Sequence, residues 1–412
     1  MKIFETLKSD GNRAVKLFGI TIYKKTTDFN IEGNCVKTTR YQSFLGGIIK
    51  TCKINDEFGY YLNKQISILG CAILKNINDG NFVTWYLFNN IIKQLSLKER
   101  FKKLYFKYID EKYDDIYILN ANSGEIYLFL TYLADAFIIK NGSKNPLLIA
   151  TKKYHLEMIK MLCPEIPAIY LNNFNAKIKF STFDIDKFKF YMIFNNGYFK
   201  QVEFAIKNNT INTYHYFTYM CEELKIKENE INFRNPVLSY ENQALMLKKI
   251  EDLKLNLDNF VFIAPEAQSC MLVDNSFWVS LIKSIKEKGY DVFVNLVDNS
   301  VDLTGAEYKS CFLTYSEVFA LAQKSKKIIS LRSGLTECLV QTNIPVDVLY
   351  TKFRNRHFYD DMSVEQVMSG FSIRKLLNVN KNLINEYNYK YYDHQNLINE
   401  ITKDIGGNKI AV

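Results

Sequence analysis

The sequence predicts an α/β protein with two Rossmann-like domains whose parallel sheets face a central cleft. The chain has 412 residues, which is more than a single hydrophobic core usually serves. Short runs of β-formers alternate with amphipathic helical stretches in two series, one from residue 114 and one from residue 260. Polar turns follow several predicted strands, at the end of a parallel sheet where ligands usually bind.

Four segments are expected along the chain. Residues 1–110 carry mixed signals, with the best helical spacing at 88–113, and we assign them to the first domain. Residues 111–250 and 251–380 are the two Rossmann-like domains. Residues 381–412 are expected to form a helical tail.

The first domain is predicted to alternate strands and helices in the βαβ manner. We expect strands at 114–121, 146–151 and 167–171, and helices at 123–142, 153–163 and 212–226. Gly142 and Pro164 supply stop signals for the first two helices. This alternation predicts a parallel sheet with helices on both faces.

The second domain repeats the pattern. Strands are expected at 260–264, 291–296, 326–331 and 345–350, and helices at 275–289, 314–325 and 333–343. Thr314 and Glu317 have the spacing of a capping box at the start of the second of these helices.

Composition excludes several classes of protein. The net charge of +9 suits a phosphate-bearing partner, but the basic residues are scattered and no nucleic-acid-binding motif is present, so no nucleic-acid partner is expected. Eight cysteines without CxxC pairs or metal-ligand spacing are typical of reduced thiols, and no metal is expected. No apolar run has the length of a signal peptide or membrane span, which predicts a cytoplasmic protein. The stretch from Val15 to Tyr23 fits either contact with an anionic membrane or an ordinary packed segment.

The turn after the first predicted strand carries a candidate catalytic residue. Asn122, Ser123 and Gly124 form a polar turn, and Glu125 opens the next helix. A carboxylate here can take a proton from an acceptor hydroxyl, or it can simply complement the helix dipole. The sequence leaves both interpretations open.

The turn after residue 264 is a candidate binding loop. Small residues at 264 and 267 would let a diphosphate approach closely, and Gln268 and Ser269 add polar groups. Glu266 either binds sugar hydroxyls or faces solvent.

The turn at 332–334 is a candidate phosphate site because it opens a predicted helix. Ser333 and Gly334 offer backbone N–H groups, Arg332 a bidentate donor, and Glu337 an acceptor for ribose or sugar hydroxyls. The alternative is a helix cap at Ser333 with Arg332 in a surface ion pair. A basic cluster after the next strand would lie at the same edge, and it comprises Lys352, Arg354, Arg356 and His357.

Residues 114–352 resemble the heptosyltransferase-like branch of the GT-B glycosyltransferases. Gly124-Glu125 is similar to the family's Gly-Asp turn, whose Asp is the base, and "IAPEAQS" with Trp278 is similar to its Pro-Gly-Ala loop and early helical Trp. "SLRSGLTE" resembles its Asp-Ser-Gly turn. Arg332 replaces that Asp, Glu266 replaces a glycine, and the family's following His is absent. The opening "VKLFGITIYKK" is similar to those of bacterial transferases for lipopolysaccharide, lipooligosaccharide and capsule glycans.

The resemblance implies a metal-independent, inverting transferase that uses a nucleotide-sugar donor and a bacterial glycan or glycolipid acceptor, with no cofactor. It implies acceptor contacts from the first domain and donor contacts from the second. Asp184 and Asp186 form a DxD pair that fits a metal ligand or a solvated turn. A nucleotide-sugar epimerase or hydrolase, and a noncatalytic glycan- or nucleotide-binding protein, remain as alternatives.

Overall fold

The computed structural model divides the chain into two compact units. One comprises Met1–Tyr113 with Asn173–Phe190, and the other comprises Asp114–Asn172 with Tyr191–Val412. The structure describes residues 4–9, 12–17, 20–32, 35–44, 49–56, 62–68, 71–78, 82–87, 90–96, 102, 106–171, 182–194, 210, 215–297, 300–353, 363–389 and 393–405. The sequence predicts that residues 1–110 belong to the first α/β domain, and this division places them elsewhere.

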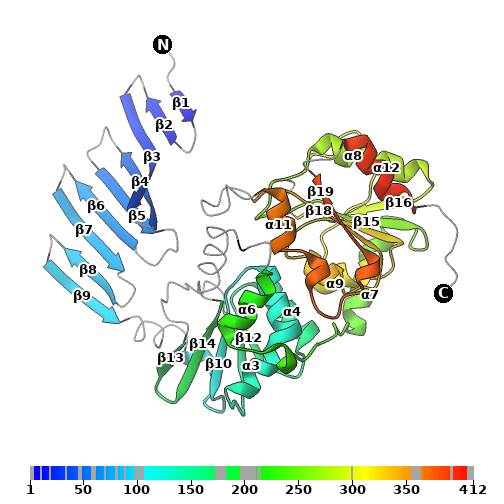
Figure 1. The fold of residues 1–412 in the computed structure, drawn as a ribbon. Helices are drawn as coiled ribbons and strands as arrows, with labels where there is room; N and C mark the ends of the chain where they lie inside the picture. Colours follow the sequence, from blue (N-terminus) through cyan, green and yellow to red (C-terminus); the bar gives the residue numbers. More distant parts are fainter. Residues whose placement is uncertain are drawn as a thin grey trace. The chain divides into compact units, whose positions relative to one another are not determined.

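The first unit contains a sheet of nine antiparallel strands in simple sequence order, coloured blue to cyan in Figure 1. The sequence between strands contains Asp-Gly at 10–11 and 79–80, a pair that favours tight hairpin turns. The strands are β1 (Phe4–Ser9), β2 (Asn12–Leu17), β3 (Ile20–Glu32), β4 (Cys35–Phe44), β5 (Ile49–Asp56), β6 (Leu62–Ile68), β7 (Cys71–Asn78), β8 (Phe82–Leu87) and β9 (Asn90–Ser96). The 3-10 turn η2 (Phe106–Tyr108) and strand β13 (Thr182–Ile185) also belong to this unit.

The helix predicted over 88–113 is therefore wrong for its first part. Asn90–Ser96 is strand β9, which pairs antiparallel with β8. Its apolar residues Ile91, Ile92 and Leu95 suit a helical face equally well, and the pairing with β8 decides the outcome.

The second unit begins with the predicted first series. Strands β10 (Asp115–Leu119), β11 (Leu147–Ala150) and β12 (Ala168–Tyr170) pair in parallel, with β10 next to β11 and β11 next to β12. The helical segments are α2 (Ser123–Leu128), the π-helical turn η3 (Phe129–Leu133), α3 (Ala134–Lys140), α4 (Lys153–Leu162) and α6 (Tyr216–Leu224). From the last strand of this series, β14 (Phe188–Ile193), Tyr191 stacks on Tyr117 of β10 with ring centroids 4.9 Å apart.

The second series forms a sheet in the order β16-β15-β17-β18-β19, with every pair parallel. The strands are β15 (Phe260–Ala264), β16 (Asp291–Val294), β17 (Lys327–Leu331), β18 (Val346–Tyr350) and β19 (Ile384–Asn388). The helices are α7 (Tyr240–Glu251), α8 (Asn275–Glu287), α9 (Tyr315–Ala322), α10 (Thr336–Leu339), α11 (Val364–Gly370) and α12 (His394–Thr402), and the 3-10 turns are η4 (Glu228–Glu230), η5 (Ile373–Lys375) and η6 (Lys381–Leu383). The strand order reverses between β15 and β17, which is where such sheets bind ligands.

Two expectations for the second series need correction. The tail at 381–412 is not wholly helical, because β19 pairs in parallel with β18 and completes the sheet. The helix expected at 333–343 is reduced to α10, four residues long. The predicted capping box of α9 is present, and the Thr314 N–H donates to Glu317 Oε2 at 2.7 Å.

Buried side chains join the two α/β halves. One hydrophobic cluster contains Tyr117 of β10 together with Phe262 of β15 and Val348 of β18, so it includes residues of both sheets. A second cluster lies between the β15 sheet and helices α8 and α12, which are neighbours in Figure 1. The halves therefore share one core and bury one another's apolar surface.

Candidate active site

A pocket of about 630 Å³ lies where the two α/β halves meet. Its walls come from the turns that follow β10, β11, β15, β16 and β17, each at the carboxyl end of its strand. A pocket of this size and position is typical of a small-molecule site in an open parallel sheet.

The structure places most of the predicted site residues in this wall. From the first series these are Asn122, Ser123, Gly124 and Glu125, and from the second Glu266, Gln268, Ser269, Arg332, Ser333, Gly334 and Glu337. Lys352 is not among the lining residues, and its backbone carbonyl accepts from Met271 N at 2.7 Å. Arg354, Arg356 and His357 lie outside the described residues.

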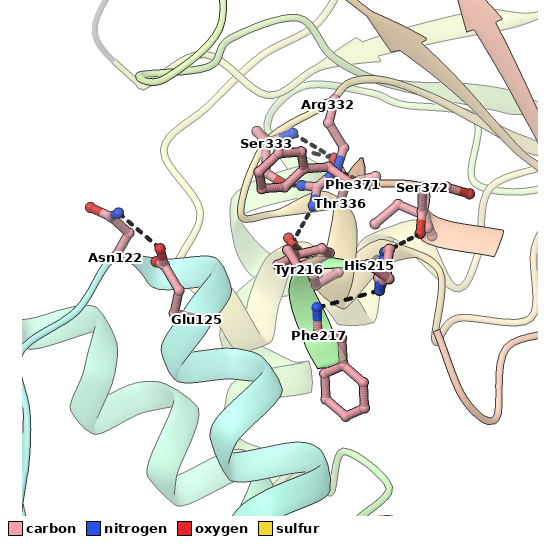
Figure 2. A network of polar contacts seen from close by, with 12 residues as sticks. Asn122, Glu125, His215, Tyr216, Phe217, Arg332, Ser333, Thr336, Phe371 and Ser372 are labelled. Carbon is pink, nitrogen blue, oxygen red and sulfur yellow. Dashed lines mark hydrogen bonds and ion pairs between the residues drawn. The ribbon is translucent and has the colours of Figure 1, made fainter. Parts of the chain in front are cut away.

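Glu125 occupies the first turn of α2, and its side chain is half-buried. Asn122 Nδ2 donates to Glu125 Oε1 at 3.2 Å, as Figure 2 shows. This bond fixes the orientation of one carboxylate oxygen toward the turn. The arrangement suits a proton acceptor at the pocket wall.

Arg332 and Glu337 form a buried ion pair rather than an open phosphate site. Arg332 Nη2 lies 2.7 Å from Glu337 Oε1, and the two side chains are 8% and 2% exposed. The other guanidinium nitrogens donate to Phe371 O at 3.1 Å and to Ser333 O at 2.8 Å. Burial alone would lower the pKa of Arg332, but Glu337 raises it, and the net direction is upward.

Tyr216 of α6 completes this buried group. Its hydroxyl donates to Glu337 Oε1 at 2.8 Å, and the Arg332 guanidinium lies 5.5 Å from the centre of its ring. The ring also stacks on Phe371 at 5.1 Å, and Figure 2 shows the stack beside the guanidinium. His215 Nε2 contacts Ser372 O at 2.8 Å, so α6 is bonded to the second half at two consecutive residues.

The turn at 333–334 packs directly against the start of α2. A Cβ added to Gly334 would lie 2.4 Å from Ser123 Oγ and 2.6 Å from Gly124 N, a separation that real atoms do not adopt. The Ser333 N–H is not available for a phosphate in this arrangement, because it donates to Thr336 Oγ1 at 3.0 Å. Only a residue without a side chain fits at 334.

Glu266 organises the loop after β16. Its carboxylate accepts the backbone N–H groups of Val297 at 2.5 Å and Ser300 at 3.1 Å, and the Ser300 hydroxyl at 2.9 Å. The sequence offered sugar binding or solvent exposure for this side chain. The observed role is structural support of a pocket wall.

Sequence reasoning missed several lining residues in the first half of α4. Lys153, Tyr154 and Glu157 line the pocket, and Tyr154 stacks on Tyr315 of α9 at 6.3 Å. Glu157 Oε2 accepts the N–H of Tyr315 at 3.1 Å, and burial raises the pKa of this carboxyl above its ordinary value. These residues follow β11 in the same way that Glu125 follows β10, and that position was the available signal.

Among the described residues no group of three or more His, Cys, Asp or Glu side chains is placed to hold a metal ion. Asp184 and Asp186 are exposed, and Asp186 pairs with Lys102 at 2.5 Å. The part of the chain that the structure describes contains no helix with the length and apolar character of a membrane span.

The charge of the wall is more acidic than the sequence led us to expect. Of the described lining residues, four are glutamates and two are cations, Lys153 and Arg332. Glu337 neutralises Arg332, whereas the Lys153 side chain is exposed. The pocket is therefore rich in hydrogen-bond acceptors, which suits hydroxyl groups.

Comparisons with known proteins find similarity in three-dimensional structure only. No protein-family model and no curated protein matches the chain. Solved structures similar to it include the iron-containing dodecameric glycosyltransferase TibC of enterotoxigenic E. coli, at 15% identity and a TM-score of 0.38, covering 65% of this chain and 63% of that one. The chain thus spans less than two thirds of TibC.

For two further similar structures, the match includes nearly all of the solved protein. A glycosyl transferase family 9 protein of Veillonella parvula has 8% identity and a TM-score of 0.41, covering 72% of this chain and 98% of that one. The E. coli ADP-heptose lps heptosyltransferase II has 9% identity and a TM-score of 0.41, covering 70% and 98%. Heptosyltransferases are thus among the similar structures, as the resemblance in sequence indicated. At these identities and scores no activity carries over to this chain.

The predicted fold class is confirmed. The second unit has two Rossmann-like series of parallel strands whose carboxyl ends face one pocket, the arrangement known as GT-B.

Proposed function

We propose that this protein is a metal-independent, inverting glycosyltransferase that moves a sugar from a nucleotide-sugar to a bacterial surface glycan or glycolipid. One observation supports this most. Glu125 from the first series and the turns at 266–269 and 332–334 from the second line the same pocket. The proposed proton acceptor and the proposed nucleotide-sugar site then lie on the same pocket. The acceptor would bind next to the first and the donor next to the second.

The donor nucleotide is assigned to the β15/β17 side of the pocket. Gln268 and Ser269 supply polar groups there, and Arg332 has five N–H donors of which three are bonded to protein atoms. The remaining donors would share the guanidinium between Glu337 and the diphosphate. Stabilising the negative charge that develops on the leaving diphosphate is the main catalytic task.

The acceptor hydroxyl is assigned to the Glu125 side. Glu125 would remove its proton as the hydroxyl attacks the anomeric carbon, and a single displacement inverts that centre. Asn122, Ser123 and Gly124 would position the acceptor next to this carboxylate. Lys153, whose side chain is exposed at the pocket wall, adds a cation on the same side.

The first experiment is a calorimetric titration with UDP, GDP, ADP and CMP, followed by turnover assays with bacterial glycan acceptors. Glu125→Gln is expected to lower kcat by about a hundredfold or more while the nucleotide Kd stays unchanged. Glu251→Gln, an exposed change at the end of α7, is the matched control. Full turnover by the Glu125→Gln variant would remove the proposed base, and failure to bind any nucleotide at millimolar concentration would remove the donor assignment.

The acidic wall favours a second candidate, a noncatalytic glycan-binding protein with the same fold. Arg332 is paired with Glu337 and the Ser333 N–H is bonded to Thr336, so two groups predicted to bind phosphate are occupied by protein atoms. Glycan binding without nucleotide binding would identify this function. Donor turnover that needs no acceptor would instead identify a nucleotide-sugar epimerase or hydrolase.

The proposal places the protein in the cytoplasm with peripheral contact at the inner face of the membrane, where a glycolipid acceptor would be available. A sugar acceptor anchored in lipid favours an enzyme that stays close to the bilayer surface. Cell fractionation tests this location.

A further inference from the structure

The positive charge of the chain is concentrated in the nine-stranded unit. Residues 1–113 contain 19 of the 53 Lys and Arg residues but only 10 of the 44 Asp and Glu residues. The whole excess of nine positive charges therefore lies there, and residues 114–412 are formally neutral. The excess positive charge therefore lies outside the part of the chain that forms the pocket. It suits an anionic partner other than the ligand of the pocket.

The strand register separates the charges between the two faces of this sheet. Residues at directly paired positions lie on the same face, so the pairing assigns each residue to a face. One face, here called the basic face, carries Lys8, Arg13, Lys25, Arg40, Lys53, Lys64 and Lys93. Of the four acidic residues of the nine strands, Asp28, Glu32 and Asp56 fall on the opposite face, and Glu5 pairs with Lys16 beside the register shift in β2.

Several basic residues on this face are paired directly with one another. Arg40 pairs with Lys53 and Lys53 with Lys64, which puts three cations in a row across β4, β5 and β6. Like charges at directly opposed positions destabilise a sheet. On the opposite face, by contrast, Lys24 and Lys50 both pair with Ser43. The register therefore places three basic residues at adjacent positions on the basic face, with no acidic residue paired to any of them.

Large apolar and aromatic residues share the basic face. Phe44, Ile49 and Ile68 occupy paired positions on β4, β5 and β6, and Trp85 pairs with Lys93. Phe44 is 36% exposed. Basic residues interleaved with aromatic and apolar residues, without acidic ones, are characteristic of surfaces that bind the interface of an anionic bilayer.

We propose that the basic face of the nine-stranded sheet binds an anionic lipid surface. The row Arg40, Lys53 and Lys64 meets the lipid phosphates, while Phe44 and Trp85 belong to the same contact. This inference gives a surface to the membrane contact proposed above. It is independent of the sugar-transfer reaction, since vesicle binding is measured without donor or acceptor.

Vesicle sedimentation of the full chain tests the proposal. We expect the protein to bind vesicles of phosphatidylcholine and phosphatidylglycerol at a 3:1 ratio, which contain about a quarter anionic lipid and so attract basic segments. It should not bind vesicles of pure phosphatidylcholine. Salt should weaken the binding to anionic vesicles. The triple variant Arg40→Gln, Lys53→Gln, Lys64→Gln should bind about a hundredfold more weakly, at roughly a factor of five for each basic residue lost.

The matched control is the triple variant Lys24→Gln, Lys50→Gln, Lys75→Gln, which removes the same charge from the opposite face. The vesicle affinity of this control should fall by less than about fivefold if binding depends on the basic face and not on the net charge of the protein. Equal losses in the two variants would overturn the proposal. So would binding of single-stranded RNA or an acidic polysaccharide by a protein that ignores the vesicles.

Tryptophan fluorescence gives a second test, which uses the wild-type protein and does not depend on the folding of a charge variant. The chain has two tryptophans, and Trp278 is fully buried in α8. Anionic vesicles should shift the emission of the wild-type protein to the blue, brominated lipids should quench it, and Trp85→Phe should abolish both effects. Unchanged emission on anionic vesicles would contradict the proposal.

Discussion

The Arg332 guanidinium donates to the Glu337 carboxylate over 2.7 Å inside the junction of the two α/β halves. Glu337 also accepts the hydroxyl hydrogen of Tyr216, while its Oε2 atom has no hydrogen-bond partner among the residues that the structure describes. A buried pair of this kind contributes little net stability, yet loss of one member leaves an uncompensated charge.

Arg332→Ala is therefore expected to lower the free energy of unfolding by about 3–5 kcal/mol. The double variant Arg332→Met, Glu337→Met should recover most of that loss, because it removes both charges and keeps the volume filled. Urea denaturation of the wild-type protein, the double variant and the single variants Arg332→Met and Glu337→Met completes the double-mutant cycle. Additive effects would show that the two side chains do not interact.

Substitution of Gly334 is expected to destabilise the contact between the two α/β halves. Gly334→Ala would force a Cβ to within 2.6 Å of Gly124 N, a backbone atom, so the cost should be about 1–3 kcal/mol or more. Gly124→Ala brings its Cβ only to 3.0 Å from Gly334 Cα and is the milder comparison. Thermal unfolding should therefore show a larger loss for Gly334→Ala, and the reverse order would refute this packing.

Two buried histidines should make the protein sensitive to acid. Burial lowers the pKa of both His155 and His215 to about 3, below the ordinary value in the unfolded chain. The unfolded state then binds more protons, so each histidine lowers stability by about 1.4 kcal/mol for every pH unit below about 6.5, until pH 3. Urea titrations at pH 7.5 and 5.5 measure this loss, and His155→Asn should reduce the slope by about one half.

Glu266 is expected to control the order of the loop after β16. Glu266→Ala removes the acceptor for two backbone N–H groups and the Ser300 hydroxyl, which leaves the loop without these bonds. Limited proteolysis should then cut next to Val297 and next to Ser300 several-fold faster than in the wild-type protein. Cleavage at an unchanged rate would show that other contacts hold the loop.

Local signals in the sequence were sufficient for much of the fold. Thr314 and Glu317 predicted the start of α9 because a capping box needs only neighbouring residues. The turns at Glu125, Glu266 and Arg332 were found because ligand sites of parallel sheets lie at strand ends.

The contacts within the site could not be predicted in the same way. Arg332 was expected to face a phosphate, but its partners include the carbonyl of Phe371, and Tyr216 lies 121 residues before Glu337. Such partners become neighbours only when the two halves fold together. The short α10 and the added strand β19 likewise depend on packing and pairing, not on local spacing.

The shared core of the two α/β halves limits how the protein can be recombined. Each half resembles a self-contained α/β module, but here Tyr216 and Gly124 on one side match Glu337 and Gly334 on the other. A chimera that takes only one half from another protein would bring together mismatched surfaces. The ligand preference of the pocket would have to be transplanted as individual loops, or as both halves at once.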